Sequence, residues 1–151
     1  MTAELAMADN WTEWFQVIIP GRPQRWQRPF QVGRRRKHQP EVEAAKAAIQ
    51  WRVRAGLGSA QALPHGQPCR VRLTARFPRP QRGKYLDRND PGPQLMPVVP
   101  DIDNIAKLYL DACSGLVWHD EAQVVGVETL KVYAAVGVDP GVVFAVDTWT
   151  P

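Results

Sequence analysis

The sequence predicts one α/β (α+β) domain, in which a mixed β-sheet of about four strands carries two main helices. Three segments indicate this class: residues 69–77 alternate between apolar and polar side chains, and residues 40–58 and 101–114 have helical composition or spacing. The expected organisation along the 151 residues is a flexible leader over residues 1–12 and a single domain over residues 13–151.

The first half of the chain is expected to hold two strands and one helix. Residues 14–20 are rich in β-branched and aromatic side chains, which favours a strand. A helix is expected from Pro40, because proline suits a first helical turn, to the glycine at position 58. Residues 69–77 place apolar side chains on one face and mostly arginines on the other, which predicts a half-buried strand with a basic exposed face.

The second half is expected to hold one helix and two strands. Apolar residues spaced by three and four predict a helix over residues 101–114, with Asp101 as its N-cap and a glycine after its end. Residues 121–133 and 142–149 read as strands, separated by an Asp-Pro-Gly turn.

Two basic segments, residues 21–39 and 78–99, are expected to be loops because of their prolines and glycines. Their candidate DNA-binding side chains are Arg22, Arg25, Arg28, Arg34, Arg35, Arg36, Lys37, Arg79, Arg82 and Lys84. Residues 22–88 contain 17 of the 19 Lys and Arg and carry a formal charge of +14, whereas the rest of the chain carries −10. This division suits an enzyme that holds a polyanion near bound cations, unless the two halves neutralise each other through surface ion pairs.

Several classes of protein are excluded by composition. No apolar run approaches the roughly 20 residues of a membrane span, and the N-terminus does not resemble a signal peptide. Two cysteines make no disulfide framework, and His38, His65 and His119 lack the spacing of a zinc site. A cytoplasmic protein with free thiols is expected.

Five carboxylates and one lysine fall within 21 positions: Asp101, Asp103, Lys107, Asp111, Asp120 and Glu121. Clustered carboxylates repel one another, and a divalent cation removes that penalty. Mg²⁺ is bound by one or two carboxylates with water and substrate phosphate. Two aspartates at a helix start, joined by an acid that a short connection returns beside the helix, therefore predict a metal site. Taken singly, these acids also fit a helix cap, a solvated helix face and a polar turn.

The motif Pro-Asp-Ile-Asp-Asn-Ile-x-Lys at 100–107, with Trp-His-Asp-Glu-Ala-Gln-Val-Val at 118–125, closely resembles the RusA family of Holliday junction resolvases (crossover junction endodeoxyribonucleases). The close resemblance covers residues 97–131. It implies a small homodimer of mixed α/β fold that nicks four-way DNA junctions symmetrically with Mg²⁺ or Mn²⁺, in DNA recombination and repair. Such proteins are often encoded by bacteria or their prophages.

The resemblance also assigns roles. Asp101 and Asp103 match the first pair of metal-binding carboxylates, and Lys107 matches the essential lysine. Glu121 matches the remaining catalytic carboxylate, a position that is commonly aspartate in the family, and Asp120 can share its role as a ligand.

The basic loops would then bind phosphates of a branched DNA, each contact adding roughly 0.9 to the salt dependence of binding. Trp26 or Phe30 is a candidate wedge between bases, or packs under its own loop. Two other functions stay open: a non-catalytic, structure-specific DNA-binding protein and a less selective metal-dependent nuclease. Chemistry on a small phosphorylated molecule does not explain the strongly basic segment.

Overall fold

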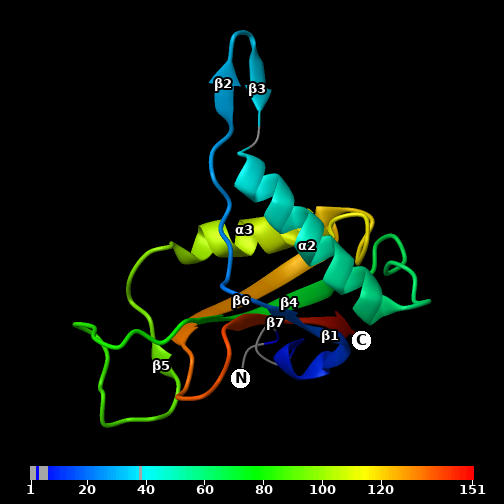
Figure 1. The fold of residues 1–151 in the computed structure, drawn as a ribbon. Coiled ribbons are helices and arrows are strands. Elements are labelled where there is room, and N and C mark those ends of the chain that lie inside the picture. Colours follow the sequence, from blue (N-terminus) through cyan, green and yellow to red (C-terminus); the bar gives the residue numbers. More distant parts are fainter. Residues whose placement is uncertain (1–2, 4–6, 38) are drawn as a thin grey trace.

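The computed structural model describes residues 3, 7–37 and 39–151 as a five-stranded mixed sheet with two helices on one of its faces (Figure 1). The sheet consists of β1 (Trp11–Pro20), β4 (Cys69–Phe77), β5 (Gln94–Leu95), β6 (Val124–Tyr133) and β7 (Gly141–Trp149). The helices are α2 (Pro40–Leu57) and α3 (Ile102–Cys113), and two short 3₁₀ turns are η1 (Met7–Asn10) and η2 (Glu121–Gln123). The expected fold class is confirmed.

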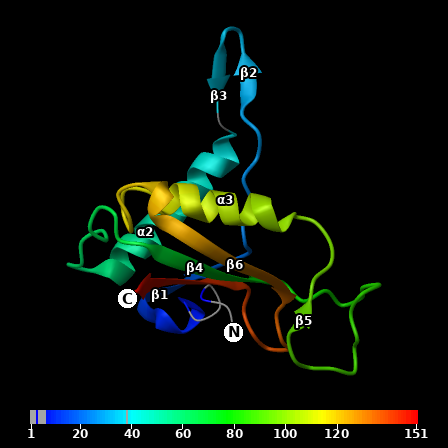
Figure 2. The same cartoon turned by 180° about the vertical axis from the view of Figure 1, so that it is seen from behind.

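The strand order is β1-β7-β4-β6-β5, and the neighbours β4 and β6 are parallel. Two parallel strands need a crossover connection, and α3 is that connection. A crossover helix starts at the carboxyl end of the first strand and ends near the amino end of the second. Figures 1 and 2 show α3 running back along β6 in this way. The start of α3 therefore lies near the carboxyl ends of β4 and β6, and its end lies near their amino ends.

The core lies between the sheet and the helices. On β4 the apolar side chains at alternate positions are buried, as the alternation predicts. They meet the buried face of α3, which includes Ile105, Leu108 and Tyr109. α2 approaches β1 closely at Gly56, where a Cβ atom would lie 3.1 Å from the ring of Phe15.

Three features of the elements differ from the expectation. The basic loop over residues 21–39 contains a hairpin of β2 (Phe30–Val32) and β3 (Arg35–Lys37), which stands away from the body in Figure 1. The loop over residues 78–99 contributes the two-residue strand β5. Part of the expected leader and His38 lie outside the described residues, and β1 already begins at Trp11. Within the described part of the chain, no helix is long and apolar enough to cross a membrane.

The open face of the sheet is not simply basic. Asp147 of β7 is 1% exposed and accepts hydrogen bonds of 2.7–2.8 Å from both Arg70 and Arg72 of β4. Glu13 and Glu128 add outer ion pairs at 2.9 and 3.7 Å. Burial alone would raise the pKa of Asp147, but the hydrogen bonds from the two arginines outweigh it and hold the pKa below its usual value. For this part of the basic segment, the alternative of neutralising ion pairs is correct.

Replacing Asp147 by Asn is expected to lower the free energy of unfolding by about 1.5–3 kcal/mol at pH 7, because the hydrogen bonds from two partly exposed arginines lose their charged acceptor. The folded-state pKa lies below the unfolded value of about 3.9. The stabilisation that the Asp147 carboxylate provides is therefore complete above the unfolded-state pKa. It is lost as the pH falls through the lower, folded-state pKa. Urea unfolding of both proteins between pH 3 and 7 measures it.

The matched control is Glu128→Gln, because Glu128 pairs with the same Arg70 but has a side chain that is 63% exposed. It is expected to change stability by less than about 1 kcal/mol. Equal losses in the two variants would contradict a special role for the buried carboxylate.

Candidate active site

The start of α3 presents two carboxylates and a lysine to solvent. Asp101 is the N-cap residue, with extended backbone angles and no capping hydrogen bond from its side chain. Asp103 lies in the first turn, and Lys107 follows one turn later, on the same side of the helix. All three residues are exposed. Since the Asp101 carboxylate does not cap the helix, its oxygens are available to another group.

The first basic loop is fastened to α3 by two of its main-chain N–H groups, one bonded to the first turn of the helix and one to a side chain in its second half. The Trp26 N–H donates to the carbonyl of Asn104 at 2.9 Å, and the Gln24 N–H donates to the Tyr109 hydroxyl at 3.4 Å. Burial raises the pKa of Tyr109 to about 12, so this hydroxyl stays neutral. The loop therefore has a fixed place beside Asp103.

Trp26 also contacts the lysine. The Lys107 ammonium lies 3.7 Å from the centre of the Trp26 ring, a cation–π contact. A groove of about 540 Å³ runs between this loop and the helix, and Arg25, Arg28 and Asp103 line it. Trp26 is thus engaged with its own domain. Phe30 in the hairpin, 38% exposed, is the aromatic residue of this segment that stays open to solvent.

The second acidic pair, Asp120 and Glu121, lies in the turn before β6. Asp120 caps η2, since its Oδ1 accepts a hydrogen bond from the Ala122 N–H at 2.9 Å. The buried Gln123 holds the turn: its Oε1 accepts from the N–H of Asp120 and its Nε2 donates to the carbonyl of Pro64. Glu121 is exposed, and its carboxylate is not used by the cap.

The two acidic pairs lie at opposite ends of α3. Twelve residues of helix span roughly 18 Å. Lys131, near the end of β6, donates to the carbonyl of Pro100 at 2.8 Å, whereas Glu121 precedes the start of that strand. Figure 2 shows both ends of this crossover. Among residues 3, 7–37 and 39–151, no group of three or more His, Cys, Asp or Glu side chains could hold a metal ion.

The expectation that a short connection returns Asp120 and Glu121 beside the helix, where they would complete a metal site with Asp101 and Asp103, is therefore not met within one chain. The physical reason is the crossover, which carries the chain along the whole length of α3 before β6 begins. The donors themselves, which are carboxylate oxygens, are of the kind that hard divalent cations prefer. Their chemistry fits such an ion, but their placement in a single chain does not.

The candidate DNA-binding residues fall into two groups. Arg79 donates to the carbonyls of Gly92 and Asp90 at 3.0 and 2.6 Å, so it holds its own loop together. The others are exposed, and in the described part of the chain none of them pairs with a carboxylate: Arg22, Arg25, Arg28, Arg34, Arg35, Arg36, Lys37, Arg82 and Lys84.

Two features of the site were not recognised from the sequence. The first is the anchoring role of Gln123, whose only signal in the sequence is its place inside the Ala-Gln-Val-Val motif. His65 and His119, which are far apart in the sequence, stack with ring centres 3.9 Å apart beside the Asp120 turn. Nothing in their spacing indicates this contact.

The chain matches the family described as Endodeoxyribonuclease RusA over residues 20–143. No curated protein matches it at a significant level. The family match includes both acidic pairs, Lys107 and both basic loops. The chain belongs to the RusA family of endodeoxyribonucleases, which are Holliday junction resolvases.

Proposed function

We propose that this protein resolves four-way DNA junctions by paired, symmetric nicks in recombination and repair, with Asp101, Asp103, Lys107 and Glu121 as its catalytic residues. The observation that carries the proposal is the fastening of the basic loop to the start of α3. It places Arg25 and Arg28 along the groove that Asp103 also lines, and Lys107 follows Asp103 by one helical turn. A phosphodiester that these cations attract would therefore bind close to the carboxylates.

The proposed cofactor is Mg²⁺, for which Mn²⁺ can substitute, held by Asp101, Asp103 and Glu121. Such an ion supplies charge neutralisation at the phosphoryl group and an activated water. Asp120 is the weaker candidate ligand, because its carboxylate already caps η2. Lys107 would stabilise negative charge on the phosphate, and its ammonium is held 3.7 Å from the centre of the Trp26 ring.

The proposed homodimer is supported by the outer edge of β6. Its neighbour β5 pairs only with Val132 and Tyr133, so among the described residues the rest of that edge has no strand beside it. The same stretch exposes Val125, Val127 and Leu130 at 62, 44 and 48%. A long, exposed and apolar edge is a template for pairing with another strand, and a second copy is the simplest partner.

Antiparallel pairing of two β6 edges about a two-fold axis would bring the acids together. The start of β6 in one copy then lies beside the end of β6 in the other. Lys131, near that end, is bonded to Pro100, next to Asp101. Glu121 would thus approach the partner's Asp101 and Asp103, and the dimer would carry two equivalent sites for two nicks.

A non-catalytic DNA-binding protein is the second candidate. The exposed hairpin and the unpaired arginines would serve it equally well. It gives no role, however, to exposed carboxylates beside a phosphate-attracting loop, which would weaken simple DNA binding.

Replacing Asp103 by Asn is expected to reduce junction cleavage at least about 100-fold, because a bound cation contributes several kcal/mol to a phosphoryl transition state. Junction affinity is expected to stay equal or rise, since a repulsive charge is removed. Cleavage of a synthetic four-way junction and of plain duplex, with and without Mg²⁺, measures this. The control is Asp139→Asn, an exposed acid in the β6–β7 turn.

Cleavage of the junction by Asp103→Asn at the native rate would contradict the proposed site. Equal cutting of junction and duplex by the native protein would instead indicate a general nuclease.

Replacing Val127 by Lys should separate the dimer, because a charge would be buried at the paired edge. One chain has a mass of 17.0 kDa. In sedimentation equilibrium, the native protein should have twice that mass and the variant should have the mass of a single chain. Cleavage should be lost with the dimer, while the circular dichroism spectrum is unchanged. Val136→Lys, at a residue of the β6–β7 turn that is 64% exposed, should stay dimeric. A dimeric, active Val127→Lys would exclude this edge as the interface.

A further inference from the structure

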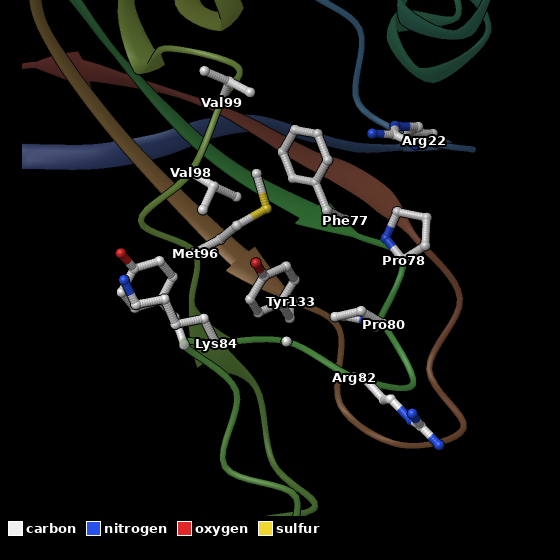
Figure 3. Close-up of a pocket in the computed structure, with 12 residues that line it drawn as sticks. Arg22, Phe77, Pro78, Pro80, Arg82, Lys84, Met96, Val98, Val99 and Tyr133 are labelled. Atoms are coloured by element: carbon white, nitrogen blue, oxygen red, sulfur yellow. The ribbon is translucent and has the colours of Figure 1, made fainter.

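A hollow of about 420 Å³ lies at the carboxyl ends of the parallel strands β4 and β6 (Figure 3). Phe77 and Tyr133, the last residues of these strands, form its floor with Met96, and all three are buried. In α/β sheets, ligands bind in the crevice outside the carboxyl ends of the strands. The position and apolar floor of the hollow therefore favour a binding site for a flat, apolar group.

The rim of the hollow is positively charged. Arg22, Arg82 and Lys84 are exposed there, and its lining includes no carboxylate. The Arg22 guanidinium lies 5.9 Å from the centre of the Phe77 ring. The Lys84 ammonium lies 5.3 Å from the ring of Tyr85, which is 51% exposed. An apolar, partly aromatic hollow with a cationic rim is complementary to a nucleotide, whose base stacks and whose phosphate is negative.

The hollow adjoins the acidic end of α3. Val98 and Val99 line it, and Pro100 and Asp101 follow directly. Lys131 fixes this segment by donating to the carbonyls of Val98 and Pro100 at 2.6 and 2.8 Å. A nucleotide seated in the hollow would therefore lie next to the chain segment that leads to Asp101.

We propose that this hollow takes one unstacked nucleotide of the DNA strand beside the crossover, with its base on the apolar floor and its phosphate at the cationic rim. The inference rests on the proposed function, because it needs a branched substrate. Removing a base from the stack costs least where the duplex is already disturbed, and at a crossover the continuous stacking of the arms is interrupted. An apolar side chain of a second copy would fill the same space but leave three cations unneutralised.

The test measures binding to four-way junctions in the absence of divalent cations. One abasic nucleotide is placed in turn at each position flanking the crossover, and in a control at the middle of an arm. For the native protein, one flanking position is expected to weaken binding about 5- to 100-fold, the range for loss of one stacked base. The control abasic site is expected to change nothing.

Val98→Trp is designed to fill the hollow from a residue that is 37% exposed. This variant is expected to bind intact and abasic junctions with equal affinity. That affinity should equal the affinity of the native protein for the abasic junction. Tyr85→Ala removes only an exposed ring and is expected to reduce the abasic effect without altering stability. Val136→Trp, outside the hollow, should behave as the native protein does.

If the native protein binds and cuts junctions but no abasic position affects it, the nucleotide site is wrong and the proposed function stands. If it binds junction no better than duplex, the proposed function fails as well. A change in the mass of the Val98→Trp protein in sedimentation would show that the hollow receives a second copy, which also overturns the inference.

Discussion

The burial of one face of α3 against the sheet fixes the positions of all the candidate catalytic groups. Because β4 and β6 are parallel, the connection between them must return over one face of the sheet. α3 is the helix of this connection, and it buries Ile105, Leu108 and Tyr109. Its first turn carries Asp101 and Asp103. The turn that follows its end carries Glu121. The same packing that stabilises the core therefore holds the acids at opposite edges of the molecule.

Some of the basic residues stabilise the fold, and others are exposed without a carboxylate partner among the described residues. Arg70 and Arg72 hold the buried Asp147, and Arg79 holds the loop between β4 and β5. The arginines of the first loop and the hairpin stay free of carboxylates among the described residues, and Gln24 and Trp26 bind their loop to α3. The strong charge division in the sequence thus has two causes: neutralisation across the sheet, and a surface suited to phosphates beside the acids.

Local pattern predicted most of the fold. The alternation over 69–77, the proline at position 40 and the spacing after Asp101 gave β4, α2 and α3 with near-correct bounds, because these signals depend on neighbouring residues. The hairpin β2–β3 gave no such signal, since both strands have three exposed residues and all three residues of β3 are basic. The acidic residues and Lys107 were singled out by their motif, and their roles stay predictions. Their separation was not predicted, because it depends on the direction of a crossover that no local pattern reveals.

The most direct test of the shared site is complementation between two inactive chains. Asp103→Asn and Glu121→Gln are each expected to be inactive alone. When they are co-expressed, the mixed dimer keeps one site with native Asp103 from one chain and native Glu121 from the other, so nicking of one strand should return. Co-expressed Asp101→Asn and Asp103→Asn, altered at the same end of α3, should stay inactive. Absence of nicking in the first mixture, with mixed dimers present, would contradict a site built from two chains.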